Sequence, residues 1–164
     1  MVLAVLLAWA MTAPAAAVRG QTAPERLDAC PLLAAAEVER VAARRLYGDP
    51  EPVALGGGAA CDYGGGTAQL LLFAGADAAT RLDGFLRAFG QQDAPKHAVA
   101  ELGPGAYAVY PKPQNAYQDT VGLLVVPARH HLLAITLAAA EGEPAESTLP
   151  GLTALTRLVL ARLP

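Results

Sequence analysis

Residues 121–139, VGLLVVPARHHLLAITLAA, decide the fold of this chain, because they contain two apolar segments separated by a short polar turn. The strand expected over Val121–Val126 is apolar on both faces, which is typical of a strand in the middle of a sheet. The strand expected over His131–Ala139 alternates larger aliphatic side chains with Ala and Thr, so one face is bulky and the other is small. With Pro127–His130 as the connection, the stretch predicts an antiparallel hairpin with a layer packed closely on its small face.

Further strands and helices are expected on both sides of this hairpin. The first helix opens at Asp28–Pro31 and ends before Gly48, and the second follows Asp77 with an apolar stripe of Leu82, Phe85, Leu86 and Phe89. The remaining elements are strands over Ala59–Tyr63, Thr67–Ala74, Ala98–Leu102 and Ala106–Tyr110, and a closing helix over Leu149–Leu163. This order predicts an α+β domain, a largely antiparallel sheet with helices packed on it.

The composition indicates a folded, single-domain protein. The chain has 164 residues, of which 54% are hydrophobic and 16% charged, and its formal net charge is −3. These values exclude a disordered chain and allow a sizeable core. The negative charge, the presence of only two lysines and an aromatic content of 5% argue against a nucleic-acid partner.

The N-terminus predicts export. Met1–Val18 contain no charged residue, and an apolar run is followed by small residues of the kind that signal peptidase reads. We therefore expect a signal peptide over residues 1–17, a polar tether over 18–27 and one domain over 28–164. The protein would be periplasmic, in the cell wall or extracellular, with no membrane insertion after cleavage. Because no Lys or Arg precedes the apolar run, an uncleaved N-terminal membrane anchor is the alternative.

Cys30 and Cys61 are the two cysteines of the chain. In an exported protein, two cysteines more often pair than stay free. A disulfide would close a loop of about 30 residues and stabilise the fold by about 3.5–4 kcal/mol. The alternative is a metal or redox site, although the chain has no Cys-x-x-Cys motif and no His lies near either cysteine in sequence.

Motifs for catalysis or cofactor binding are absent from the sequence. It lacks the zincin, P-loop, dinucleotide-binding and nucleophile-elbow patterns, and Ser147 is the only serine. His130 and His131 are adjacent on an expected strand end, so their side chains point to opposite faces and would not chelate one metal ion. We therefore expect no enzyme activity, no cofactor and no metal site.

Tyrosine is concentrated in one segment. Three of the five tyrosines, Tyr107, Tyr110 and Tyr117, lie around Pro111-Lys112-Pro113. Rigid amphipathic rings beside amides make good contact surfaces, which predicts binding residues Tyr110, Lys112, Asn115 and Tyr117. By strand alternation we expect Tyr110 to be exposed and Tyr107 to be in the core. The alternative is structural: tyrosines packed at a strand edge and a proline-rich connection to the next strand.

Several segments, taken in order, resemble a known group of proteins. They are Asp28–Leu33 with Ala36-Glu37-Val38, then Cys61-Asp62-Tyr63, then Glu101–Tyr107, and finally the last strand pair with the leucine-rich C-terminal helix. In this order they resemble small secreted proteins and lipoproteins of unknown function that are common in actinobacteria. The resemblance spans Asp28–Pro164 and implies a Cys30–Cys61 disulfide, a PsbP-like α/β/α sandwich and no catalytic residues. The chain departs from the group in lacking its lipobox cysteine and in having Pro104 where an acidic residue usually stands.

These observations predict a non-catalytic exported domain of the bacterial cell envelope that binds an unidentified partner or ligand. One alternative is a carrier of a lipid or other apolar small molecule in a pocket between the sheet and the helices. The other is an enzyme of unknown type, which would need a convergent polar cluster. The sequence makes no prediction of the oligomeric state.

Overall fold

The computed structural model describes residues 28–88, 91–113 and 119–164. The expected signal peptide (1–17), the tether (18–27), Phe89, Asn115 and Tyr117 lie outside these ranges. The helices are α1 (Ala35–Ala42), α2 (Ala78–Ala88) and α3 (Leu149–Arg162), with short 3₁₀ turns over Cys30–Leu32, Ala100–Leu102 and Ala145–Thr148. The strands are β1 (Glu51–Val53), β2 (Gly58–Tyr63), β3 (Ala68–Ala74), β4 (His97–Ala98), β5 (Tyr107–Val109), β6 (Val121–Ala128) and β7 (His131–Ala138).

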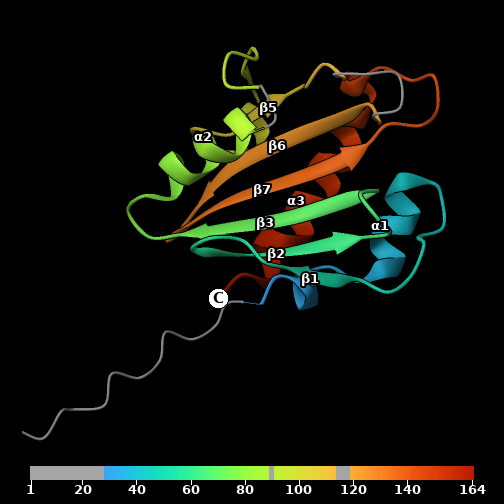
Figure 1. Ribbon diagram of the computed structural model, residues 1–164, viewed down its shortest axis with the longest axis horizontal. Coiled ribbons are helices and arrows are strands. Elements are labelled where there is room, and N and C mark those ends of the chain that lie inside the picture. The colour runs from blue at the N-terminus through green and yellow to red at the C-terminus, as the bar shows by residue number, and fades with distance from the viewer. Residues whose placement is uncertain (1–27, 89–90, 114–118) are drawn as a thin grey trace, which may run out of the picture.

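The strands form one antiparallel sheet in the order β1-β2-β3-β7-β6-β5-β4 (Figure 1). This confirms the expected α+β class. The apolar hairpin expected from residues 121–139 lies in the middle of the sheet, where β7 pairs with both β3 and β6. It is longer than expected, because β6 continues through Pro127 to Ala128 and the turn consists of Arg129 and His130 alone. Pro127 is tolerated there because β5 pairs with β6 only as far as Val125.

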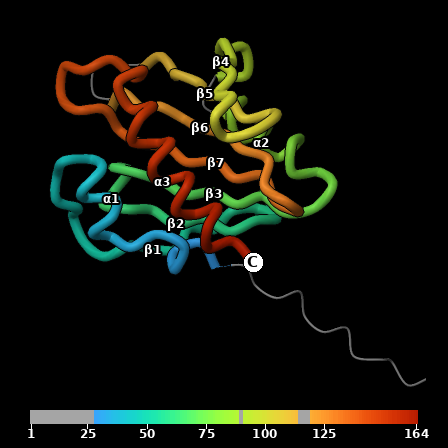
Figure 2. Tube along the Cα trace, turned by 180° about the vertical axis from the view of Figure 1, so that it is seen from behind, coloured from blue at the N-terminus to red at the C-terminus, as the bar shows by residue number. Residues whose placement is uncertain are grey.

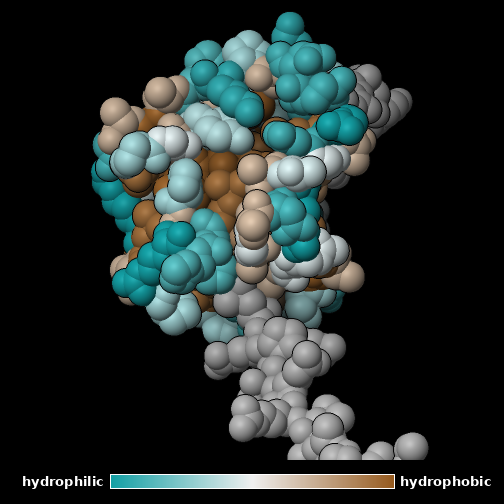
Figure 3. Space-filling view, turned by 90° about the vertical axis from the view of Figure 1, so that its left-hand side faces the viewer, coloured by the Kyte–Doolittle hydropathy of each residue, from teal (hydrophilic) through white to brown (hydrophobic). Residues whose placement is uncertain are grey.

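Helices cover both faces of the sheet. Figure 2 shows α3 crossing one face beside α1, and Figure 1 shows α2 in front of the other face. The expected closing helix is confirmed as α3, and its Leu152, Leu155 and Val159 have no exposed surface. On the opposite face, Leu82 and Leu86 of α2 are buried against the sheet. Viewed from the side where the β6–β7 turn lies, apolar residues occupy the middle and hydrophilic residues surround them (Figure 3).

The predicted pairing of Cys30 and Cys61 is confirmed. The two cysteines form a disulfide with a Cα–Cα distance of 5.0 Å, which joins the first 3₁₀ turn to β2. Beside it, the buried hydroxyl of Tyr63 donates to the carbonyl oxygens of Cys30 and Leu33, at 3.2 Å each. These contacts fix the start of the described chain on the edge of the core.

The expected first helix is wrong in its bounds. The turn at Cys30–Leu32 and α1 are separate, because Leu33 and Ala34 are extended. The carbonyl oxygens of Cys30 and Leu33 accept from the Tyr63 hydroxyl instead of from N–H groups of a continuous helix. At the start of α1, the Ala34 N–H donates to the Glu37 carboxylate at 2.9 Å. The helix then ends at Ala42, since Ala43 is left-handed with φ 52°.

The expected strand over Ala98–Leu102 is also wrong in its bounds. Only His97–Ala98 pairs with β5, and Ala100–Leu102 form a 3₁₀ turn in which the Leu102 N–H donates to the Val99 carbonyl. Among the described residues, no helix is both long enough and apolar enough to cross a membrane.

Candidate binding pocket

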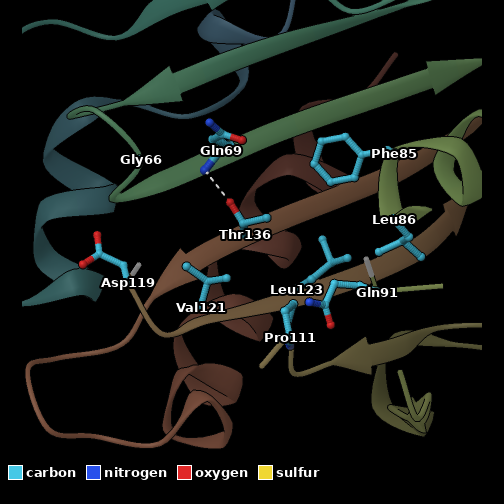
Figure 4. Close-up of a pocket in the computed structure, with 10 residues that line it drawn as sticks. All are labelled: Gly66, Gln69, Phe85, Leu86, Gln91, Pro111, Asp119, Val121, Leu123 and Thr136. Carbon is cyan, nitrogen blue, oxygen red and sulfur yellow. Dashed lines mark hydrogen bonds between the residues drawn. The ribbon is translucent and has the colours of Figure 1, made fainter. Parts of the chain in front are cut away.

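An apolar hollow lies where α2 stops short of the far end of the sheet. Each cross-strand row on this face comes from β2, β3, β7 and β6 in turn. The row Ala60, Leu71, Ala134 and Val125 is buried with Leu82 of α2. The next row is Asp62, Gln69, Thr136 and Leu123, and its last three members line a pocket of about 190 Å³ (Figure 4).

The walls of the pocket are mainly apolar. Phe85 and Leu86 come from the last turns of α2, Val121 and Leu123 from β6, and Pro111 from the segment after β5. Leu86 and Leu123 are 4% and 2% exposed, whereas Phe85 and Val121 are half-buried. An enclosed apolar cavity of about 150 Å³ holds benzene, so this volume suits a molecule of one or two small rings.

Polar groups gather at one end of the pocket. The Gln69 backbone N–H donates to Thr136 Oγ1 at 3.1 Å (Figure 4). The Gln69 side-chain Nε2 donates to Asp62 Oδ1 at 3.0 Å, and Asp62 Oδ2 accepts from the Gly66 N–H at 3.2 Å. Because Asp62 holds the nitrogen side of the amide, the carbonyl oxygen of Gln69 is presented as an acceptor.

Two carboxylates lie at the pocket. Asp119 lies on its rim and is exposed, and Asp62 stands behind Gln69. The described residues that line the pocket include no Lys, Arg or His. Lys112 is exposed and lines a neighbouring hollow, and its backbone carbonyl accepts from Gln91 Nε2 at 3.4 Å at the rim of the pocket.

Tyr107 and Tyr110 are both packed against the core, which differs from the exposed tyrosine surface that the sequence predicts. Tyr110 is half-buried against the core on the α3 side, with its ring 5.2 Å from that of His97, so the expectation that it is exposed is wrong. Tyr107 packs against the apolar cluster on the α2 side, and Lys96 Nζ lies 4.9 Å from its ring centroid. Both faces of β5 are covered, so strand alternation assigns each tyrosine to a face without making either one exposed.

Burial changes the titration of these phenols. Desolvation raises the pKa of Tyr107 above the usual tyrosine value, and the negative charge of Asp83 raises it further. Desolvation also raises the pKa of Tyr110, with a smaller contribution from Glu146. Both tyrosines are therefore neutral hydrogen-bonding groups at physiological pH. Of the predicted binding residues, Tyr110 and Lys112 lie in the described segment beside the pocket.

The pocket itself was missed by the sequence analysis. The available signal was polar residues on one face of two apolar strands, Gln69 in β3 and Thr136 in β7, which the register places side by side. Across the described part of the chain, no three His, Cys, Asp or Glu side chains gather in a way that could hold a metal ion.

Comparison with protein-family models, with curated proteins and with solved structures finds no match to this chain. The resemblance to small secreted actinobacterial proteins therefore stays a prediction.

Proposed function

We propose that this chain is an exported, non-catalytic binding domain that takes a small, largely apolar ligand in the pocket between α2 and the sheet. The pocket itself is the observation that carries this proposal. Sites for small molecules are concave and mostly apolar, with a few fixed polar groups that orient the ligand. Leu86 and Leu123 supply the apolar part here, and the amide of Gln69, fixed by Asp62, supplies the polar part.

The size of the pocket defines the ligand further. About 190 Å³ is too small for a long lipid chain, and it lies below the 300–1,000 Å³ that is usual for drug-sized ligands. Of the functions that the sequence left open, the structure therefore favours a small-molecule binder over a carrier of large lipids. The described lining offers no nucleophile beside a general base, which supports a binding role rather than an enzymatic one.

The disulfide supports an oxidising location for this domain. Disulfides persist in secreted and periplasmic proteins and are rare in the cytosol. Together with the apolar N-terminal segment, the Cys30–Cys61 bond supports export to the periplasm, the cell wall or the extracellular space. The ligand would then be a molecule that the domain meets in the cell envelope.

A fluorescent probe tests the proposal. 2-Naphthol, a two-ring alcohol, can be excited at wavelengths longer than those that tyrosine absorbs. The chain has a single tryptophan, Trp9, so little protein fluorescence overlaps with that of the probe. We expect saturable binding to the wild-type protein. Val121→Trp places a large ring in the pocket and should weaken the binding at least tenfold.

Val53→Trp is the matched control, because Val53 is 45% exposed on edge strand β1 and does not line the pocket. It should bind the probe like the wild type. Melting curves of both variants establish that they are folded. Equal binding by Val121→Trp and Val53→Trp would show that the probe sits elsewhere, and absence of binding to the wild type would contradict the proposed function.

A further inference from the structure

We infer that the ligand of this pocket is a small organic cation, an amine carried on an apolar body of one or two rings. This inference rests on the proposed function, since it names the ligand class for the same pocket. It follows from the kinds of hydrogen-bonding groups at the polar end and from the sign of the charges around them.

The polar end offers acceptors to a ligand. The backbone N–H of Gln69 bonds to Thr136 Oγ1, and one of the two hydrogens on its Nε2 bonds to Asp62 Oδ1. The carbonyl oxygen of the same amide is left to accept. A ligand that donates hydrogen bonds fits this end, and an ammonium group carries three such donors.

The charges around the pocket favour the same ligand. Asp119 lies on the rim, and the carboxylate of Asp62 lies directly behind the Gln69 amide. No positively charged residue of the described chain lines the pocket to balance them. Hydrogen bonds to charged groups are stronger than those between neutral groups, so an ammonium group would bind favourably at this end. A carboxylate there would be repelled by Asp62 and Asp119.

The apolar walls hold the rest of the molecule. Leu86 and Leu123 form the deep side, and Phe85 stands at the side of the pocket with its ring toward the space that a ligand would fill (Figure 4). An aromatic or branched aliphatic amine places its body against these residues while its nitrogen reaches Gln69. The amphipathic character of the ligand follows from this division of the pocket.

Three probes that share one ring system test the inference. 1-Naphthylmethylamine is a cation at pH 7, 1-naphthalenemethanol is neutral, and 1-naphthoic acid is an anion. Their dissociation constants are measured by calorimetry with the disulfide-bonded protein in 0.15 M salt, where attraction by the overall charge of −3 is largely screened. We expect the amine to bind about fivefold tighter than the alcohol, and the acid to bind more weakly than both.

Substitution of one carboxylate tests which residue causes the preference for the amine over the alcohol. Asp119→Asn should reduce the advantage of the amine over the alcohol to about twofold and leave the affinity for the alcohol unchanged. Asp49→Asn is the matched control, because Asp49 is exposed and lies outside the pocket, and it should keep the full preference.

The outcomes separate the two proposals. Equal affinities for the three probes, or tightest binding of the acid, would overturn the cation inference and leave the pocket as a binding site. An amine preference that survives Asp119→Asn in full would also overturn it, whatever the result for Asp49→Asn. If none of the probes binds, the proposed function fails together with the inference.

Discussion

Substitution of Thr156 by valine should stabilise the protein, although Thr156 has no exposed surface and lies in the core. It belongs to the face of α3 that packs on the sheet, and its Oγ1 has no hydrogen-bond partner. An unsatisfied buried hydroxyl costs about 1–3 kcal/mol, and valine replaces it with a methyl group of nearly the same size. We expect Thr156→Val to raise the free energy of unfolding by about 1 kcal/mol, which corresponds to a rise in Tm of about 3 °C.

Thr67→Val is the matched control, because it makes the same chemical change at another buried site. Thr67 is 5% exposed, and its Oγ1 donates to the Gly64 carbonyl at 3.2 Å. Loss of that bond should lower the free energy of unfolding by about 1 kcal/mol. Urea unfolding at 25 °C, with the disulfide intact, measures both variants. A lower stability of Thr156→Val would refute the reasoning, since it would mean that the hydroxyl is satisfied within the fold.

Three further predictions concern stability. Cys61→Ala should lower the free energy of unfolding by a few kcal/mol in denaturant titrations, and the intact mass of the wild type should be lower than that of its reduced form by two hydrogen atoms. Ala43→Gly should raise Tm, because Ala43 has φ 52° at the end of α1 and glycine adopts this conformation without strain, a gain of up to about 1 kcal/mol. Hydrogen bonds from Arg162 and from the Ala34 N–H lower the pKa of Glu37 from 4.5 to about 2. The contribution of the Glu37 carboxylate to stability is therefore complete above pH 4.5 and is lost as the pH falls through 2. Glu37→Gln should be less stable than the wild type at pH 7, and the difference in the free energy of unfolding between the two should shrink on acidification. A difference that does not change with pH would contradict this.

The central hairpin could be predicted from the sequence because its information is local. Val121–Val126 is apolar at every position but Gly122, and only a strand covered on both faces accommodates that. The disulfide was predictable for a similar reason, since an exported chain with two cysteines has one possible pairing. The ends of the first helix were not predictable from its periodicity, because the Tyr63 hydroxyl, from a strand some 30 residues away, takes the carbonyls of Cys30 and Leu33.

The pocket depends on information that no local pattern contains. The pocket exists because α2 ends at the row of Leu123 and Thr136, so the helix leaves the sheet beyond that row uncovered. The position of a helix along a sheet is set by packing of the whole face, so the stripe on α2 predicts that it is covered but not where it stops. The same limit applies to Tyr110, which alternation placed on the face that α3 then covers.

The disulfide also determines how the domain would carry a mechanical load. The described chain begins at Asp28, two residues before Cys30, and the Arg162 side chain near the other end donates to the Leu32 carbonyl at 3.0 Å. Tension applied at Asp28 passes through the S–S bond directly into β2, beside the central strands. Both α1 and edge strand β1 lie inside the covalent loop and bear none of it. Reduction would reroute the same force through α1 and β1, so a domain pulled from its N-terminal side would resist extension in its oxidised form and unravel from α1 in its reduced form.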